Sequence, residues 1–114
     1  MPVNSMWIFL SDAFLSVVAD KADPAGDRLL VRARRPGDIE CLFPEAEVFR
    51  VAGADYAFRA WLPRQRVVDA VQDRLQSLSY ANFKDSIEDS DYHDAAMEAW
   101  TAMYCYQQRI AGTS

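Results

Sequence analysis

The sequence is poor in glycine, histidine and cysteine, and each shortage argues against a class of site. Its four glycines are scattered single residues, so there is no glycine-rich phosphate-binding loop. One histidine supplies too few ligands for a transition-metal centre, and it stands in no context typical of a nucleophilic triad. Cys41 and Cys105 form no CxxC pair, and their apolar neighbours predict two buried, reduced thiols. We therefore expect no cofactor, no bound metal and no catalytic residue.

Long apolar runs and an N-terminal basic segment are also absent. Asp12, Asp20 and Lys21 interrupt the one candidate for a membrane-spanning stretch. The same stretch lacks the basic residues that open a secretion signal. We expect a cytoplasmic protein that does not bind membranes.

The overall composition is that of an ordinary globular domain. The chain has 114 residues, of which 51% are hydrophobic and 25% charged, so we expect a single α+β domain over residues 1–114. The formal net charge is -5, and a negative chain is disfavoured as a non-specific binder of nucleic acid.

Period-two patterns and turn residues predict most of the strands. Residues 6–10 and 14–19 are rich in aromatic and β-branched residues and indicate a hairpin. A strand at 29–35 directs Val31 and Ala33 to the core. Residues 47–51 and 56–62 form a second predicted hairpin, with Tyr56, Phe58 and Ala60 pointing inward.

Three helices complete the prediction. Asp38 is expected to cap a short helix over 39–43, whose buried face is Ile39, Leu42 and Phe43. A second helix runs from Pro63 to about Tyr80 and packs an apolar stripe on the sheet: Val67, Val68, Val71, Leu75 and Leu78. Ser90 or Asp91 caps a last helix that ends at a left-handed Gly112, with Ala96, Trp100, Met103 and Tyr104 on one side.

The resulting order is β-β-β-α-β-β-α-α. It predicts an α+β fold with a mostly antiparallel sheet of about four or five strands, covered on one face by helices and containing ferredoxin-like elements.

The strongest local feature is an acidic segment over residues 85–98, which contains no basic residue. Its carboxylates are Asp85, Glu88, Asp89, Asp91, Asp94 and Glu98. Carboxylates at a helix N-terminus stabilise the helix, which is one interpretation. The other is a negative face that docks on an arginine- or lysine-rich protein, and we take these six residues as the candidate partner-binding site.

Asp89, Asp91 and His93 alternate like the start of a calcium-binding loop. Asp94 and Trp100, however, stand where such a loop has its glycine and its glutamate, so we predict no metal site.

A second feature is basic. Arg32 and Arg34 share one side of a predicted strand, and Arg59 and Trp61 share the outer side of another. A sheet face of arginine and aromatic residues is how some domains bind RNA or single-stranded DNA. This nucleic-acid-binding face is an alternative function. A small carboxylate-dependent enzyme is another, because 17 acidic residues always offer some close pair.

The motifs MWIFLSDAFLSVVADK, LLVRARRPGDIECLFPEAEV, YAFRAWLPRQRV and NFKDS resemble those of a group of small uncharacterised bacterial proteins. The resemblance covers most of residues 6–104 and implies a cytoplasmic bacterial protein carried on mobile elements. It transfers no activity or functional residue.

Size and charge together favour a non-enzymatic interaction protein whose partner is a protein with a basic surface. Small acidic proteins of phages and mobile elements block nucleic-acid-binding defence complexes, including CRISPR effectors, by occupying their basic surfaces. We expect an inhibitor of this anti-CRISPR-like kind, by analogy of size and charge.

Overall fold

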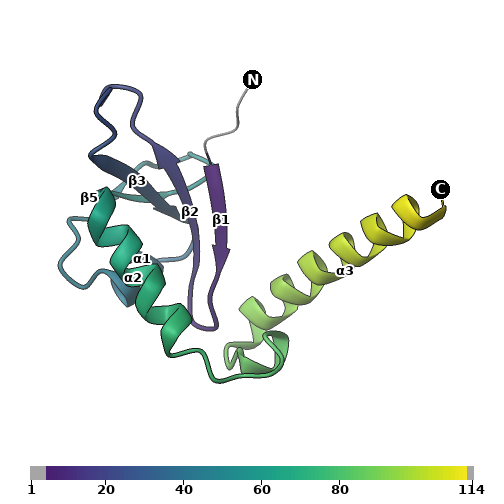
Figure 1. Cartoon of the computed structure of the whole chain (residues 1–114). Helices are drawn as coiled ribbons and strands as arrows, with labels where there is room; N and C mark the ends of the chain where they lie inside the picture. The colour runs from purple at the N-terminus through teal and green to yellow at the C-terminus, as the bar shows by residue number, and fades with distance from the viewer. Residues whose placement is uncertain (1–4, 113–114) are drawn as a thin grey trace. The chain divides into compact units, whose positions relative to one another are not determined.

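The computed structural model describes residues 5–112, apart from the Lys84 side chain, and its elements follow the predicted order (Figure 1). The chain divides into two compact units, Met1–Ser79 and Tyr80–Ser114. The first unit holds β1 (Ser5–Phe9), β2 (Phe14–Ala19), β3 (Arg28–Ala33), α1 (Asp38–Leu42), β4 (Phe49–Arg50), β5 (Phe58–Pro63) and α2 (Arg64–Gln76). The second holds the single-turn 3-10 helix η1 (Lys84–Ser86) and α3 (Ser90–Gly112). The expectation of one domain stays a prediction.

The first unit is built on a five-stranded sheet in the order β1-β2-β3-β5-β4. Every neighbouring pair is antiparallel, which confirms the predicted fold class. The predicted second hairpin is shorter than expected, since β4 contains two residues only. The chain leaves the sheet at Val51, and Gly53 turns it back with a φ of 79°. That φ lies in the left-handed region, where glycine has no steric penalty.

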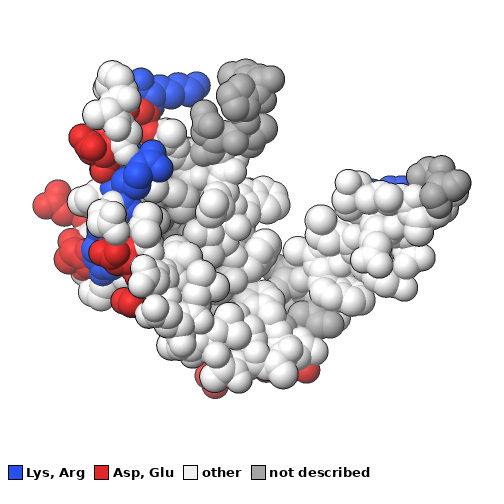
Figure 2. Space-filling view, in the orientation of Figure 1, with Lys and Arg blue, Asp and Glu red and all other residues white. Residues whose placement is uncertain are grey.

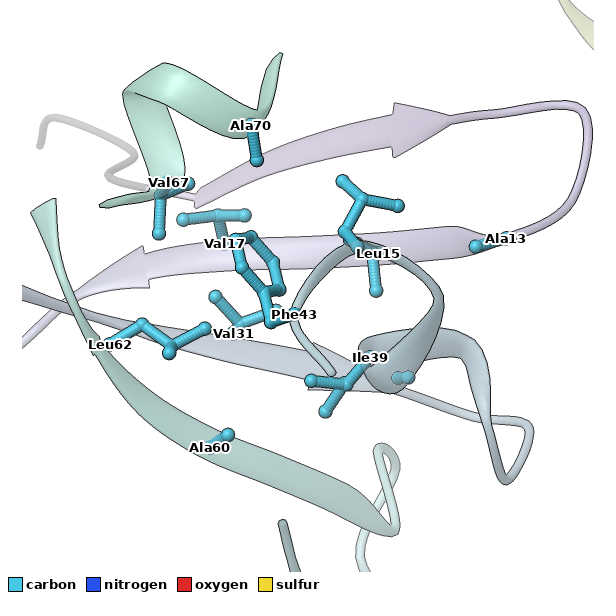
Figure 3. Close-up of a cluster of buried hydrophobic side chains, with 12 residues drawn as sticks. Ala13, Leu15, Val17, Val31, Ile39, Phe43, Ala60, Leu62, Val67 and Ala70 are labelled. Atoms are coloured by element: carbon cyan, nitrogen blue, oxygen red, sulfur yellow. The ribbon is translucent and has the colours of Figure 1, made fainter. Parts of the chain in front are cut away.

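Period-two alternation places the core on one face of the sheet, as predicted for Val31 and Ala33. These residues and Leu15 from β2 are completely buried or nearly so, and Ala60 from β5 joins them. In Figure 3, Phe43 lies at the centre of the cluster, with side chains from β2, β3, β5 and α2 around it. Ile39, Leu42 and Phe43 are all buried, so the predicted inner face of α1 is confirmed.

The start of α1 differs from the prediction. Gly37, with a φ of 91°, is the N-cap, and Asp38 is the first residue of the helix. The Asp38 carboxylate faces the sheet, where it accepts hydrogen bonds from the Phe14 N–H (3.1 Å) and from Arg35 Nε (2.8 Å). A long-range tie to β2 thus replaces the predicted local cap, and the carboxylate links two segments 24 positions apart.

Helix α2 buries a narrower stripe than its sequence predicts. Of the five expected residues only Val67 is buried, together with Ala70, while Val68, Leu75 and Leu78 are about half exposed or more. The helix also ends at Gln76 and not near Tyr80. It packs against β3 and β5, so its remaining apolar side borders an open groove of about 560 Å³ beside β1 and β2.

Candidate functional site

The acidic segment lies in the second unit and spans η1 and the first turns of α3. Ile87 and Ala96 are its buried apolar residues. Asp89 caps the helix, because its Oδ1 accepts a hydrogen bond from the Tyr92 N–H at 2.8 Å. The predicted caps, Ser90 and Asp91, are instead inside the helix. An N-cap acceptor three residues before its donor is the usual geometry, so one carboxylate of the segment has a structural role.

The six candidate carboxylates are all exposed: Asp85, Glu88, Asp89, Asp91, Asp94 and Glu98. Beyond the Asp89 cap, His93 Nδ1 lies 3.8 Å from Asp94 Oδ1, a long contact that is an ion pair only when the imidazole is protonated. Among the described side chains, which leave out that of Lys84, no hydrogen bond or ion pair engages the carboxylates of Asp85, Glu88, Asp91 or Glu98. Helix capping therefore accounts for one of the six carboxylates, that of Asp89, and the others are available to solvent or to a partner.

The carboxylates of the first unit are arranged differently, because several of them face an arginine. Asp20 accepts from Arg28 at 2.6 Å, and Glu45 accepts from Arg66 at 2.7 Å. Hydrogen bonding by Arg28 lowers the pKa of Asp20, and hydrogen bonding by Arg66 lowers the pKa of Glu45. Three further pairs join Arg35 to Asp38, Arg59 to Asp55 and Arg74 to Asp12.

Charge is therefore distributed unevenly between the two units. Residues 80–114 contain two basic and six acidic residues, a net charge of -4, whereas residues 1–79 contain ten basic and eleven acidic residues and are almost neutral. Figure 2 shows acidic and basic side chains interleaved on the first unit. The acidic excess of the chain is local to the segment that precedes and begins α3.

The described residues contain no group of three or more histidine, cysteine or acidic side chains that could hold a metal ion. Asp91 and His93 are on the first turn of α3, and Asp89 is engaged as its N-cap. A calcium loop is a turn that wraps its ligands around the ion, and a helix cannot supply that geometry.

The arginine and aromatic residues of the alternative function do lie on one sheet face, opposite the core. Arg32 and Arg59 are directly opposite each other across β3 and β5, and Leu30 pairs with Trp61. Tyr56 is buried, but it does not point into the core as predicted, since it is absent from the core cluster. It lies against this outer face, with Arg32 Cζ and Arg34 Cζ each 4.5 Å from its ring centroid. Because β5 begins at Phe58, the alternation used to direct Tyr56 inward does not extend to it.

Most of these arginines already have partners. Arg28 stacks on Trp61 at 4.3 Å and pairs with Asp20. Arg59 donates to the Tyr56 carbonyl and contacts Asp55. Arg32 donates to Ser16 Oγ at 2.8 Å, but its buried Nε has no hydrogen-bond acceptor among the described residues.

The two thiols are exposed and unpaired, which corrects the prediction of buried cysteines. Cys41 lies on α1 beside the buried Leu42 but points away from the core, and Cys105 is in the part of α3 where every residue is exposed. Local desolvation raises the pKa of the Cys41 thiol, and the nearby Asp12 carboxylate adds to the shift. This keeps the thiol protonated and weakly nucleophilic.

No protein-family model, curated protein or solved structure matches this chain. Among the residues that the structure describes, no helix is long and apolar enough to cross a membrane. The resemblance to small bacterial proteins stays a prediction.

Proposed function

We propose that the acidic segment, residues 85–98, is a docking face for a basic surface on a protein partner. The observation that carries this proposal is the group of exposed carboxylates that no described arginine or lysine neutralises: Asp85, Glu88, Asp91 and Glu98. Long-range attraction between opposite charges accelerates association and selects partners of the right sign.

The contrast with the first unit supports the proposal. There, arginine side chains neutralise Asp20, Asp38 and Glu45 within the fold. Maintaining a net charge of -4 over residues 80–114 costs repulsion that a purely structural segment would reduce by including basic residues. A docking role would explain why the segment contains so many acidic residues despite this repulsion.

We extend the proposal to the class of partner. Surfaces that bind nucleic acid are basic because they neutralise phosphates, so an exposed acidic helix start competes for the same surface. The protein, encoded by a phage or mobile element, would then act in the cytoplasm and without catalysis. It would inhibit a nucleic-acid-binding complex.

The test compares two variants with the same change in net charge. The segment variant carries Glu88→Gln, Asp94→Asn and Glu98→Gln, which spares the Asp89 cap. The control carries Glu40→Gln, Glu47→Gln and Asp73→Asn, three exposed carboxylates of the first unit. The whole 114-residue chain of each variant is used for affinity capture from the native host, followed by mass spectrometry. The proposal expects one basic protein or complex that wild type and control retain and the segment variant loses. Equal retention by all three, or no specific retention by wild type, would contradict it.

A second candidate is single-stranded nucleic acid bound on the outer sheet face. It is favoured by Arg32 and Arg34, which contact an aromatic ring but no carboxylate among the described residues. An electrophoretic shift assay at low salt tests it: retardation of a labelled oligonucleotide that Trp61→Ala abolishes would support it, and absence of retardation would end it.

A further inference from the structure

The later part of α3 presents an apolar seam whose spacing is that of a helix–helix contact. Ala96, Trp100, Met103, Gln107 and Ile110 are separated by alternating steps of four and three residues. This alternation keeps side chains on one line along a helix that packs lengthwise against another helix. It differs from the wider stripe of a helix lying on a sheet.

The seam is well exposed beyond its first residue. Trp100 and Ile110 are about half exposed, and Met103 is 62% exposed. Every described residue from Thr101 to Gly112 is exposed. Trp100 and the neighbouring Tyr104 stack with ring centroids 5.3 Å apart and ring planes 6° from parallel, so two large rings already pack together in the single chain. Side chains that already pack together in the single chain lose less conformational entropy on binding, which lowers the free-energy cost of association.

Charge is kept away from the seam. From residue 99 to 112 the sole charged side chain is Arg109. At 100° per residue, Asp94, Glu98 and Arg109 lie roughly 140° to 160° around the helix axis from the middle of the seam.

We propose that this seam binds a second copy of the same chain, so that two α3 helices pack together as a dimer. A second copy fits because an uncharged seam meets an identical seam without like-charge repulsion, while both sets of carboxylates point outward. The proposal rests on the exposed seam of α3 and is independent of the proposed function.

The available area sets the expected strength. Trp100, Met103 and Ile110 of the seam, together with the flanking Tyr104 and Tyr106, are all about half exposed or more. They offer roughly 500 Å² per chain, or about 1,000 Å² for two copies, which is near the lower limit of a specific interface. We expect a dimer of this size to have a dissociation constant of about 10 to 100 μM. Gln107, in the middle of the seam, lowers the affinity further, since a polar residue at a core position selects register at a cost in stability.

Sedimentation equilibrium of the full chain at increasing concentration tests the proposal. The chain mass is 12.9 kDa, and wild type should approach twice that value. Met103→Glu with Ile110→Glu should give a single-chain mass throughout. Thr101→Glu with Gln108→Glu adds the same charge on the other side of α3 and should still dimerise. Far-UV circular dichroism checks that each variant keeps its helix.

Gln107→Leu provides a second, independent readout, because it should tighten the dimer by about tenfold. Three results would overturn the proposal. The first is a single-chain mass for wild type up to about 0.5 mM, a concentration well above a micromolar dissociation constant. The second is a dimer that survives the Met103 and Ile110 changes with its helix intact. The third is a dimer whose dissociation constant is the same with leucine at position 107.

Discussion

Removing the Asp38 carboxylate should destabilise the first unit more than removing any exposed carboxylate. This side chain is 6% exposed, and it accepts one hydrogen bond from the backbone of Phe14 and one from the Arg35 guanidinium. Asp38→Ala deletes both bonds and leaves the Phe14 N–H without this acceptor. A bond to a charged donor contributes about 1.5 to 3 kcal/mol and a neutral one about 1 kcal/mol.

The expected loss is smaller than the sum of these contributions, because Arg35 is 37% exposed and water can replace part of its bond. We predict that Asp38→Ala lowers the free energy of unfolding by about 2 to 3 kcal/mol. With a slope near 1.5 kcal/mol per molar urea, the midpoint falls by roughly 1.3 to 2 M. Asp38→Asn keeps an acceptor oxygen and should lose about half as much.

Urea unfolding followed by circular dichroism measures both midpoints. Glu40→Gln is the matched control, since Glu40 is an exposed carboxylate in the same helix and its loss should change the midpoint little. If Asp38→Ala stays within about 0.5 kcal/mol of wild type, the tie between α1 and β2 does not contribute to stability as argued.

Three further outcomes are expected. Phe43→Ala leaves a cavity at the centre of the core and should lower the free energy of unfolding by about 3 to 5 kcal/mol, measured by urea unfolding. Arg28 holds the pKa of Asp20 below its ordinary 3.8, so their pairing stabilises the fold above about pH 4 and is lost as the pH falls below it. Asp20→Asn should therefore flatten the dependence of the urea midpoint on pH between about pH 5 and 3. Asp89→Ala removes the N-cap of α3 and should lower helix content by circular dichroism, whereas Glu98→Ala should not.

Each outcome has a result that would contradict its reasoning. A loss below about 1 kcal/mol for Phe43→Ala would mean that the core closes around the missing ring. An unchanged pH profile for Asp20→Asn would remove Arg28 pairing as a source of acid sensitivity. Equal helix content in the Asp89 and Glu98 variants would show that the cap does not hold the start of α3.

The sequence predicts features whose cause is local. The alternation around Val31 and Ala33 correctly located a buried face, because a strand has one core side whatever it pairs with. Features that depend on distant partners were not predicted. Arg74 and Asp12 are 62 positions apart, and no local pattern connects them. The sequence predicts Asp38 as a helix cap, whereas in the structure its carboxylate accepts a hydrogen bond from the Phe14 N–H of β2.

The apolar stripe of α2 also depends on contacts that are distant in the sequence. Its periodicity was real, but the width of the stripe that is buried depends on where the helix crosses the sheet. Since α2 packs on β3 and β5, Val67 is buried and Leu75 is not. For the candidate site, the sequence located the acidic residues, while their lack of basic partners became visible only in the structure.

Residues 85–98 are proposed to bind a basic protein surface through their charge. The dissociation constant between the full chain and the captured partner measures this binding, for wild type, for the segment variant and for the charge-matched control of the first unit, at low and high salt. We expect the segment variant to bind about tenfold or more weakly at low salt and the control to bind like wild type, and we expect added salt to reduce the difference in affinity. Equal dissociation constants for all three proteins at low salt would contradict the proposal.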